Sequence, residues 1–368
     1  MNDTGYMRMA LELAKKGMGW TAPNPMVGAV IVKDGRIIGQ GWHERWGEAH
    51  AERNALASCL EPPEGATMYV TLEPCCHHGR QPPCTDAILE AGIRRVVVGA
   101  GDPNPLVAGK GIRILQEHGV AVTEHVLEAE CRKLNEVFFH FIRTKRPFVV
   151  MKYAMTMDGK IAAYTGASKW ITGETAREHV QTQRHRYTGI MVGVGTVLAD
   201  DPMLTCRIPD GKQPVRIVCD TSLRTPLSAQ IVATADRIPT ILATCCPDRE
   251  RQIPYEKAGC RILCLEEKNG HVDLEQLMER LGQEQIDSIL LEGGGTLNWA
   301  ALESGIVQKI QAYIAPKLFG GQTARTPVEG AGVPLPENGF MLKNSVITPL
   351  GEDFLIESEV IQDVYRTC

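Results

Sequence analysis

Apolar positions along this chain follow two different periods, and segments of the two kinds alternate. Residues Tyr6 to Lys16 have apolar residues at helical spacing and are followed by a glycine, which predicts an amphipathic helix. Residues 21–43 contain two apolar runs joined at Asp34-Gly35, a dipeptide typical of a tight hairpin turn. The chain is therefore expected to open with one helix and a β-hairpin.

The segment between residues 50 and 146 continues this alternation. Strands are predicted within residues 67–73, 94–105 and 120–126, and helices within residues 50–60, 84–92, 109–119 and 127–146. The last of these is predicted as one long helix. Strands that alternate with helices indicate a layered α/β domain. Pro147 follows the basic end of the long helix, so two domains are expected, at residues 1–146 and 147–368.

The second half has the same α/β character. Residues 147–162, 215–226 and 239–246 each predict a strand, and a helix is expected after Thr172 or Gly173. Residues 188–207 predict a buried strand that ends at Gly193 and Gly195, followed by a loop with paired aspartates. Residues 287–305 combine a buried strand, three glycines and a helix.

Composition narrows the class of protein. A chain of 368 residues with 43% hydrophobic and 23% charged residues is an ordinary globular chain of two domains. A net charge of −5 argues against a nucleic-acid-binding surface. No apolar run approaches the roughly 18 residues of a membrane span, and the acidic start is unlike a secretory signal. Cysteines without an evident pairing pattern favour a reducing cytoplasm.

A metal-site motif occupies residues 50–84. His50, Cys75 and Cys84 offer one nitrogen and two sulfurs, which suit a tetrahedral zinc ion with one open position. Glu52 follows the histidine by two residues, and H-x-E followed by P-C and a further cysteine is the signature of zinc-dependent deaminases of cytosine- and adenine-like rings. In this chain eight residues separate the two cysteines, where the signature has two.

Binding one metal ion requires these residues to lie at particular positions in their helices. His50 and Glu52 converge on one ion only if both lie in the first turn of a helix, and Cys84 is likewise expected to open a helix. Cys76, His77 and His78 lie in the same loop and are the rival ligands, ranked lower because Cys75 directly follows the Glu73-Pro74 turn and Cys84 has the helix N-terminus. In the expected chemistry, Glu52 moves the protons of a hydrolytic deamination.

Other polar positions carry weaker signals. Asn24, between two prolines, is as well explained by a ligand contact as by an ordinary turn, and His43 is as well explained by a structural role as by a pocket position. Gly293 to Thr296 form a candidate anion-binding turn at a helix start, although a glycine-rich turn is more often only a turn. With Gly193 and Gly195 it makes a nucleotide pocket plausible, but the G-x-G-x-x-G fingerprint is absent.

Taken together, the motifs PNPMVGAVIV, HAERNAL, TLEPCCHHGRQPPC, KYAMTMDGKIA, WITG, GVGTVLADDPMLTCR and LEGGGTLN resemble the bifunctional deaminase–reductase family of riboflavin biosynthesis. The resemblance covers nearly the whole chain and includes the long spacing between the two cysteines. It implies an N-terminal cytidine-deaminase-like three-layer α/β/α domain and a C-terminal dihydrofolate-reductase-like α/β domain that uses NADPH. The implied reactions are deamination of a diamino-hydroxy-(phosphoribosylamino)pyrimidine, then reduction of the ribosyl group of the resulting uracil to a ribityl chain.

The resemblance also implies site residues. The deaminase substrate would contact Asn24, His43, His77 and Arg80. The cofactor NADPH would lie near Ala154, Trp170, Thr196, Asp200, Ser222 and the turn of Gly294, Gly295, Thr296, Leu297, Asn298, Trp299 and Ala300. The reductase substrate would contact Ser168, Arg184, Leu204, Arg207 and Glu292. Lys152 and Asp200 are the candidates for protonating the sugar oxygen, and Arg224, from its charge alone, for the 2′-phosphate of NADPH.

Two other interpretations remain at this stage. The first half also fits a zinc deaminase of nucleosides or tRNA joined to an unrelated domain. A non-catalytic binding protein stabilised by zinc would need a fourth protein ligand, from Cys76 or His77, and would leave Glu52 without a role. In the favoured interpretation the partners are small phosphoribosylaminopyrimidines, with no nucleic acid and no membrane, and the relatives suggest a homo-oligomer.

Overall fold

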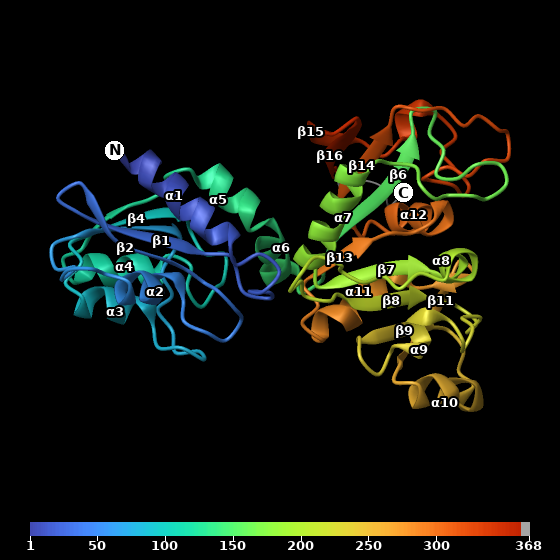
Figure 1. Cartoon of the computed structure of the whole chain (residues 1–368). Coiled ribbons are helices and arrows are strands. Elements are labelled where there is room, and N and C mark those ends of the chain that lie inside the picture. The colour runs from blue at the N-terminus through green and yellow to red at the C-terminus, as the bar shows by residue number, and fades with distance from the viewer. Residues whose placement is uncertain (362–368) are drawn as a thin grey trace. The chain divides into compact units, whose positions relative to one another are not determined.

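The computed structural model describes residues 1–361, and the chain divides into two compact units, Met1–Lys145 and a second unit that begins at Arg146 (Figure 1). The boundary expected from the sequence, between residues 146 and 147, lies one residue from this division. None of the helices in the described residues combines the length and the apolar character that crossing a bilayer requires.

The first unit is built on a five-stranded sheet with the order β2-β1-β3-β4-β5. Its strands are β1 (Gly28–Lys33), β2 (Arg36–Trp42), β3 (Thr67–Leu72), β4 (Arg95–Ala100) and β5 (Ala121–Thr123). Strand β1 runs antiparallel to β2 and β3, whereas β3, β4 and β5 are parallel. The predicted hairpin turn is confirmed: Asp34 and Gly35 have φ angles of 50° and 75°, as a tight turn with two left-handed residues requires.

Helices cover both faces of this sheet (Figure 1). They are α1 (Asp3–Lys15), α2 (Ala51–Ala57), α3 (Cys84–Glu90), α4 (Lys110–Glu117), α5 (Glu128–Leu134) and α6 (Glu136–Thr144). Helices α1 and α5 lie on one face, and α2, α3 and α4 lie on the other. This is the expected three-layer α/β/α arrangement.

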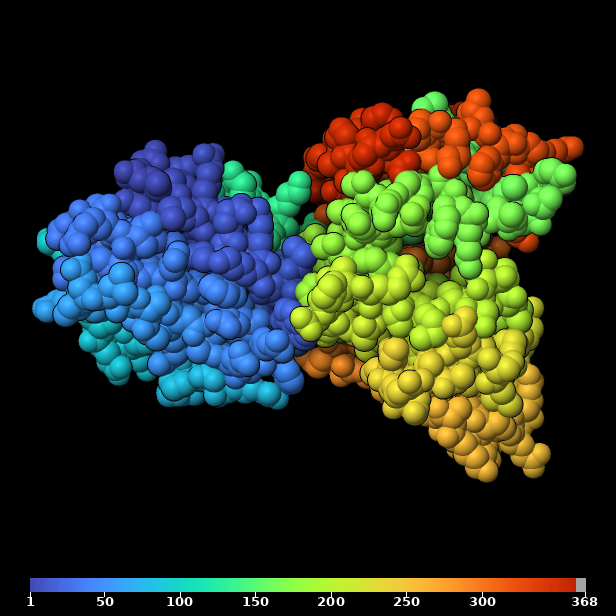
Figure 2. All heavy atoms as spheres, viewed as in Figure 1, coloured from blue at the N-terminus to red at the C-terminus, as the bar shows by residue number. Residues whose placement is uncertain are grey.

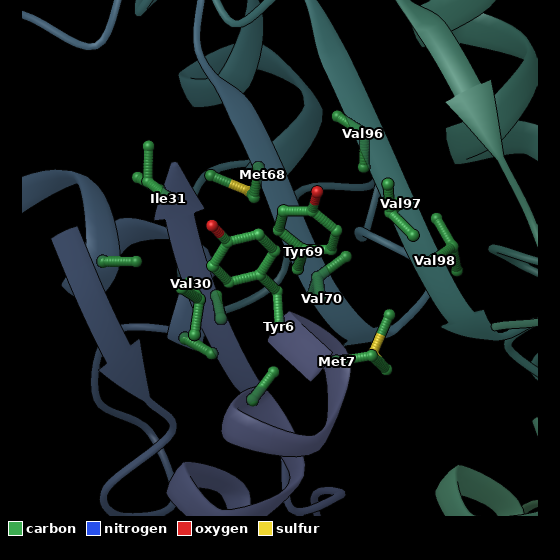
Figure 3. Close-up of a cluster of buried hydrophobic side chains, with 14 of the residues drawn as sticks. Tyr6, Met7, Val30, Ile31, Met68, Tyr69, Val70, Val96, Val97 and Val98 are labelled. Carbon is green, nitrogen blue, oxygen red and sulfur yellow. The ribbon is translucent and has the colours of Figure 1, made fainter. Parts of the chain in front are cut away.

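Successive side chains of a strand point to opposite faces of the sheet, so buried apolar residues pack against helices on both faces. Figure 3 shows Tyr6 and Met7 of α1 meeting side chains of β1, β3 and β4, and the rings of Tyr6 and Tyr69 lie 5.0 Å apart. Arg95 of β4 donates to Asp3 at the start of α1 at a distance of 2.6 Å. The first helix is therefore fixed to the sheet by both apolar packing and an ion pair.

The prediction of one long helix over residues 127–146 is wrong. Helix α5 ends at Leu134 and α6 begins at Glu136, because Asn135 leaves the helical conformation with φ −104° and ψ 25°. The buried Asn135 side chain instead accepts a hydrogen bond from the Met26 amide (2.8 Å) and donates one to the Met26 carbonyl (2.9 Å). A tertiary contact outweighs the local helical periodicity at this residue.

The second unit is built on a nine-stranded sheet with the order β10-β9-β8-β7-β13-β6-β14-β16-β15. The strands are β6 (Phe148–Thr156), β7 (Gly189–Gly193), β8 (Val215–Cys219), β9 (Thr240–Thr244), β10 (Arg261–Cys264), β13 (Ser288–Leu291), β14 (Val307–Ala315), β15 (Leu342–Leu350) and β16 (Asp353–Val360). The first seven strands in spatial order run parallel to one another. At the far edge, β16 runs antiparallel to β14, and β15 runs antiparallel to β16.

The remaining elements of this unit connect the strands. They are α7 (Glu174–Arg186), α8 (Val194–Asp200), α9 (Gln230–Ala233), α10 (Arg249–Lys257), the two-stranded hairpin β11 (Glu267–Lys268) and β12 (His271–Val272), α11 (Leu274–Gln283), α12 (Gly295–Glu303) and the short 3₁₀ helix Pro336–Asn338. In Figure 2 the yellow segment around β8, β9 and α10 forms one end of this unit, and the red segment with β15 and β16 forms the other. The α/β architecture expected for the second domain is confirmed.

One local prediction fails in this unit. Residues 194–200, expected as a loop after the strand, form the helix α8, which begins directly after β7 with Gly193 at its N-cap position. Val194 and Val197 are buried, so one side of this short helix packs into the core. The glycines at 193 and 195 made the segment resemble a turn, and seven residues are too few for a helical period to stand out.

Candidate functional site

The predicted zinc ligands meet at the starts of two helices. His50 is the N-cap residue of α2, and Cys84 is the first residue of α3. Cys75 follows β3 and is held against α3 because its carbonyl accepts hydrogen bonds from the amides of Cys84 (3.0 Å) and Thr85 (3.2 Å). The expectation that His50 and Glu52 both belong to the first turn of a helix is confirmed.

The three ligand atoms have the spacing of a tetrahedral site. The Nδ1 atom of His50 lies 3.5 Å from the Cys75 sulfur and 3.4 Å from the Cys84 sulfur, and all three ligand atoms lie within 4.8 Å of one another. A tetrahedral zinc ion at about 2.3 Å from sulfur and about 2.0–2.1 Å from nitrogen separates such ligands by about 3.5 Å. The residues therefore fit zinc with three protein ligands and one open position.

The rival ligands do not join this cluster. Within the described residues, the group able to hold a metal contains His50, Cys75 and Cys84, and none of the rivals. The thiol of Cys76 lies 3.8 Å from the Leu106 carbonyl, outside the cluster. A closed four-ligand structural site is therefore not formed by these side chains.

Glu52 lies beside the ligands in a water-poor environment. Its side chain is 3% exposed, and burial, together with the nearby Cys75 sulfur, raises the pKa of its carboxyl group to about 6. The hydrogen bond from the Cys84 thiol and the proximity of His50 lower the pKa of Cys75 and favour its thiolate. A carboxyl group that titrates close to neutrality beside the Cys75 thiolate is suited to accept and return protons.

Two of the four predicted substrate contacts lie in a row beside His50, with Asn24 against His43 and His43 against His50. The side-chain amide of Asn24 lies 3.3 Å from Nε2 of His43, whose Nδ1 lies 3.0 Å from the Ala49 carbonyl. The rings of His43 and His50 pack edge to face, 5.3 Å apart. Burial lowers the pKa of His43, so the ring is neutral near pH 7.

The other two predicted contacts lie on the loop before α3. The Nδ1 atom of His77 is buried and has no hydrogen-bond partner among the described residues. Arg80 is exposed, and its guanidinium group stacks on the Trp46 ring at 3.9 Å. A buried ring nitrogen without a partner and an accessible cation are both available to a polar ligand.

Sequence reasoning missed the part played by Glu73. This buried carboxylate accepts hydrogen bonds from the amides of Gly109 (3.0 Å), Gly111 (3.1 Å), Ile112 (3.3 Å) and Asp102 (3.3 Å). It thereby fixes the Pro74-Cys75 turn to the start of α4. The E-P-C triplet was a visible signal, but its glutamate was considered only as part of a rigid turn.

The second unit gathers three charged side chains around the carboxyl end of β13. Lys152 lies on β6, Glu292 directly follows β13, and Arg184 lies on α7. The Nζ atom of Lys152 is 3.6 Å from Glu292, and Arg184 donates two hydrogen bonds to the same carboxylate. In an open α/β sheet, this edge is where ligands bind.

A cavity of about 440 Å³ opens near the ends of β7, β8 and β13. Many of the predicted cofactor and substrate residues line it, namely Ser168, Thr196, Asp200, Gly294, Gly295, Thr296, Leu297 and Ala300, together with Arg224. Asp200 is the last residue of α8, and neither Lys152 nor Glu292 belongs to the lining of the cavity. The cavity thus gathers the glycine-rich turn and the two segments that follow β7 and β8.

Other predicted residues lie outside the lining of this cavity. Exposed Trp170 stacks with Arg177, Trp299 packs against Phe340, and Ala154 packs beside β16. Asn298 is fully buried, donating to the Pro327 carbonyl at 2.7 Å, and Leu204 is a core residue at 3% exposure. Ser222 and Arg207 are exposed. Asn298 and Leu204 are buried by the protein itself, and the Oδ1 atom of Asn298 has no hydrogen-bond partner among the described residues.

Comparison with known proteins agrees with both halves of the chain. The family model described as the RibD C-terminal domain matches residues 147–356, and the cytidine and deoxycytidylate deaminase zinc-binding region matches residues 1–100. The riboflavin biosynthesis protein RibD of Actinobacillus pleuropneumoniae is 55% identical over 98% of this chain and 96% of its own length. The chain belongs to the RibD family. RibD of Escherichia coli K12 is 44% identical over 87% of this chain and 89% of its own length.

Solved structures of the RibD family share the whole fold. The Acinetobacter baumannii RibD structure (form 1) has a TM-score of 0.87 at 38% identity and covers 98% of this chain and 99% of its own. As a member of the family, the chain is a bifunctional enzyme of riboflavin biosynthesis, with a zinc-dependent deaminase and an NADPH-dependent reductase. Neither a deaminase with an unrelated second domain nor a non-catalytic binding protein is favoured, since both family models match.

Proposed function

We propose that the first unit hydrolytically deaminates 2,5-diamino-6-(5-phosphoribosylamino)pyrimidin-4-one, and that the second reduces the ribosyl group of 5-amino-6-(5-phosphoribosylamino)uracil to ribityl. The single observation that carries the proposal is the cluster of His50, Cys75 and Cys84 beside buried Glu52. A Thermotoga maritima structure described as a diaminohydroxyphosphoribosylaminopyrimidine deaminase and 5-amino-6-(5-phosphoribosylamino)uracil reductase supports the substrates. It has a TM-score of 0.83 at 38% identity and covers 97% of this chain and 98% of its own.

In the deaminase site, His50, Cys75 and Cys84 hold the metal and Glu52 moves the protons. Zinc in this position supplies a Lewis acid that lowers the pKa of a water molecule in the open position to about 7. With the metal bound, Glu52 would take one proton from that water and pass it to the ring nitrogen. It would then take the second proton from the hydroxyl added to the ring carbon and give it to the amino group, which leaves as ammonia. Its burial and raised pKa support both directions of transfer.

The deaminase substrate is held by polar groups around this centre. Asn24 and His43 adjoin His50 and contact the pyrimidine ring, and the unpaired Nδ1 of His77 offers a further hydrogen bond. Exposed Arg80 meets the substrate phosphate. The stacking of Arg80 on Trp46 supports this role because it holds the guanidinium group extended over the loop.

In the reductase site, NADPH supplies a hydride to the open-chain sugar carbon. Lys152 donates the proton that the sugar oxygen takes up, and its ion pair with Glu292 supports this role by fixing the ammonium group. Asp200 is the second candidate for this proton transfer and, as a cavity-lining residue, also contacts the cofactor. Arg184, Glu292, Ser168, Arg207 and the backbone of Leu204 contact the sugar phosphate and pyrimidine.

The cofactor lies along the cavity in this proposal. The turn Gly294–Ala300 and Thr196 hold the phosphates, which the open N-terminus of α12 favours. Ala154, Trp170 and Ser222, which do not line the cavity, lie near the ends of the bound cofactor. The partners are therefore small molecules, with no nucleic acid and no membrane.

Self-association and a cytoplasmic location complete the proposal. The terminal strand β15 leaves one sheet edge open, and Leu342, Val346, Ile347 and Phe354 of the β15–β16 hairpin are 40–63% exposed. Open edges and exposed apolar patches favour association, here with a second copy of the chain. The free cysteines throughout the described residues support a reducing compartment. Sedimentation of the wild type and of Ile347→Lys tests the self-association.

The activities are tested in sequence on the purified full-length protein. The diaminopyrimidine substrate is added with zinc and ammonia release is followed, and NADPH is then added and its absorbance at the reduced-nicotinamide band is recorded. We expect ammonia release first and NADPH oxidation only after it. Absence of both signals would refute the proposal, and NADPH oxidation in a sample that has released no ammonia would show that the reductase takes a different substrate.

A further inference from the structure

The face of the nine-stranded sheet that α7 covers carries a row of polar residues beside the reductase site. Lys152 of β6 pairs in register with Gln311 of β14, and Gln311 pairs in turn with Glu357 of β16. Tyr313 lies two residues after Gln311 on β14 and therefore projects from the same face of the sheet. Tyr313 and Gln311 are 0% and 1% exposed. Tyr313 is thus inaccessible to a substrate and can influence the reaction only through a neighbouring side chain.

That neighbour is Lys152. Its Nζ atom lies 5.7 Å from the centroid of the Tyr313 ring, within the range of a cation–π interaction. The Lys152 side chain is 14% exposed, and a cation–π interaction is strongest where the cation has lost most of its water. The ammonium group therefore has two electron-rich neighbours, the Glu292 carboxylate and the face of the Tyr313 ring.

The ion pair with Glu292 is not enough to fix the ammonium group. Arg184 donates hydrogen bonds of 2.8 Å and 3.0 Å to the two carboxylate oxygens of Glu292, whereas Lys152 stays at 3.6 Å. A lysine is a point charge on a flexible four-carbon stem, so one long ion pair leaves its position loosely defined. A second contact, from the Tyr313 ring, restricts the positions that the ammonium group can take.

The Tyr313 ring is itself anchored by His179 of α7. The Tyr313 hydroxyl lies 2.8 Å from Nδ1 of His179, and Nε2 of the Gln183 amide lies 3.3 Å from Nε2 of the same imidazole. Burial lowers the pKa of His179, so its ring is neutral near pH 7. Because an amide nitrogen can only donate, Nε2 of His179 accepts, and Nδ1 carries the proton and donates to the Tyr313 hydroxyl.

The hydrogen bonds that orient His179 continue to the sheet. Nε2 of Gln311 donates to Oε1 of Gln183 at 3.2 Å and to Oε1 of Glu357 at 3.0 Å. Since the oxygen of the Gln183 amide faces Gln311, its nitrogen faces His179, and the direction of each hydrogen bond is determined. Helix α7 and strand β14 are therefore joined by a polar network as well as by apolar packing around Tyr313.

We propose that Tyr313 is a positioning residue of the reductase, which holds the Lys152 ammonium group in place for proton transfer, and that His179 fixes the Tyr313 ring for this task. The inference rests on the role of Lys152 proposed above and adds the residues that hold it. A correctly placed proton donor stabilises the transition state more than the bound substrate. Loss of the Tyr313 ring should therefore lower kcat with little change in KM.

Reductase kinetics of the full-length protein, with NADPH and directly supplied aminouracil substrate, test the role of the ring. Tyr313→Leu should lower kcat by about 5- to 30-fold, the loss expected for one desolvated cation–π contact, with KM within about threefold. Tyr313→Phe keeps the ring and loses only the hydroxyl, so its loss should be smaller. His179→Ala should match Tyr313→Phe, and His179→Asn, whose amide can donate from the position of Nδ1, should recover most of the wild-type rate.

A double-mutant cycle with Lys152→Met distinguishes positioning of Lys152 from general support of the fold. If Tyr313 acts through Lys152, Tyr313→Leu should change the residual rate of Lys152→Met by less than about twofold. Val180→Ala is the matched control, because Val180 is buried on the same helix and belongs to the same apolar cluster as Tyr313. It should leave kcat within about twofold. The deaminase rate of each variant serves as an internal control.

The outcomes separate this inference from the proposed function. A wild-type kcat for Tyr313→Leu, or an equal loss in the wild-type and Lys152→Met backgrounds, would overturn the inference alone. A wild-type reductase rate for Lys152→Met would refute the proposed proton donor, and the inference would fail with it. If thermal unfolding shows that Tyr313→Leu is unfolded at the assay temperature, His179→Ala takes its place in the cycle, and the same two results decide.

Discussion

Arg184 of α7 and Glu292, the residue after β13, are joined by two parallel hydrogen bonds, of 2.8 Å from Nε and 3.0 Å from the terminal nitrogen. Lys152 approaches the same carboxylate at 3.6 Å. Burial alone would raise the pKa of Glu292, but the charges of Arg184 and Lys152 outweigh it and lower the pKa to about 2. One ionised carboxylate therefore orients both cations at the reductase site.

The first prediction concerns pH and the variant Glu292→Gln. Because the folded-state pKa of Glu292 is depressed, its contribution to stability is complete above its unfolded pKa of about 4.3 and is lost as the pH falls toward 2. A lowering of this size corresponds to about 3 kcal/mol. Calorimetric unfolding of wild type and variant should therefore show a difference in stability that is large at pH 7 and shrinks below pH 4.3. A difference that is constant with pH would contradict this account.

Glu52→Gln should separate deamination from metal binding. The amide has nearly the same shape but cannot take up a proton, so the deaminase rate should fall by at least about 100-fold. Zinc content should not change, because Glu52 is not one of the three ligands. Reduction of directly supplied aminouracil substrate should also be unchanged and serves as an internal control. Near-normal ammonia release by the zinc-loaded variant would refute the assigned role.

The metal ligands are tested by a pair of adjacent cysteines. Cys75→Ala removes a ligand and should lower zinc content well below the expected value of about one ion per chain, with a loss of stability confined to the deaminase unit. Cys76→Ala is the matched control, since its thiol lies near the Leu106 carbonyl outside the cluster. Elemental analysis and calorimetry measure the two effects. Equal zinc loss in both variants would mean that the loop, and not the Cys75 sulfur, determines binding.

The sequence was sufficient to predict features that depend only on residues close to one another in the chain. The Asp34-Gly35 turn, the helix start at His50 and the metal motif depend on residues close in sequence or on ligand types with few alternatives. The glycine turn before α12 was found for the same reason. For these features the residue type itself limits the conformation, so the sequence alone was enough to predict them.

Long-range contacts determined what the sequence did not reveal. Helical periodicity continues through Asn135, and only the distant Met26 backbone explains the break. The four amides that surround Glu73 likewise come from residues 102–112. Each case depends on which segment of the fold lies opposite the residue, and no local pattern contains that information.

The last prediction uses the break at Asn135 to test how the deaminase pocket is held. Met26 lies two residues after Asn24, so the hydrogen bonds from Asn135 fix the segment that carries Asn24 toward His43. Asn135→Ala leaves the half-buried amide and carbonyl of Met26 without these hydrogen-bond partners, which costs at most about 1–3 kcal/mol for each group.

Two further variants separate the loss of the Asn135 hydrogen bonds from the general effect of a substitution in this segment. Asn135→Asp keeps the acceptor for the Met26 amide and loses the donor to the Met26 carbonyl, so an intermediate loss is expected. Lys133→Ala, at an exposed position near the end of α5, should change stability by less than about 0.5 kcal/mol. Thermal unfolding gives the stability, and deaminase kinetics should show a raised KM with a smaller change in kcat, because Asn24 contacts substrate while Glu52 stays in place. Loss of stability with an unchanged KM would show that Asn135 supports the fold without positioning Asn24.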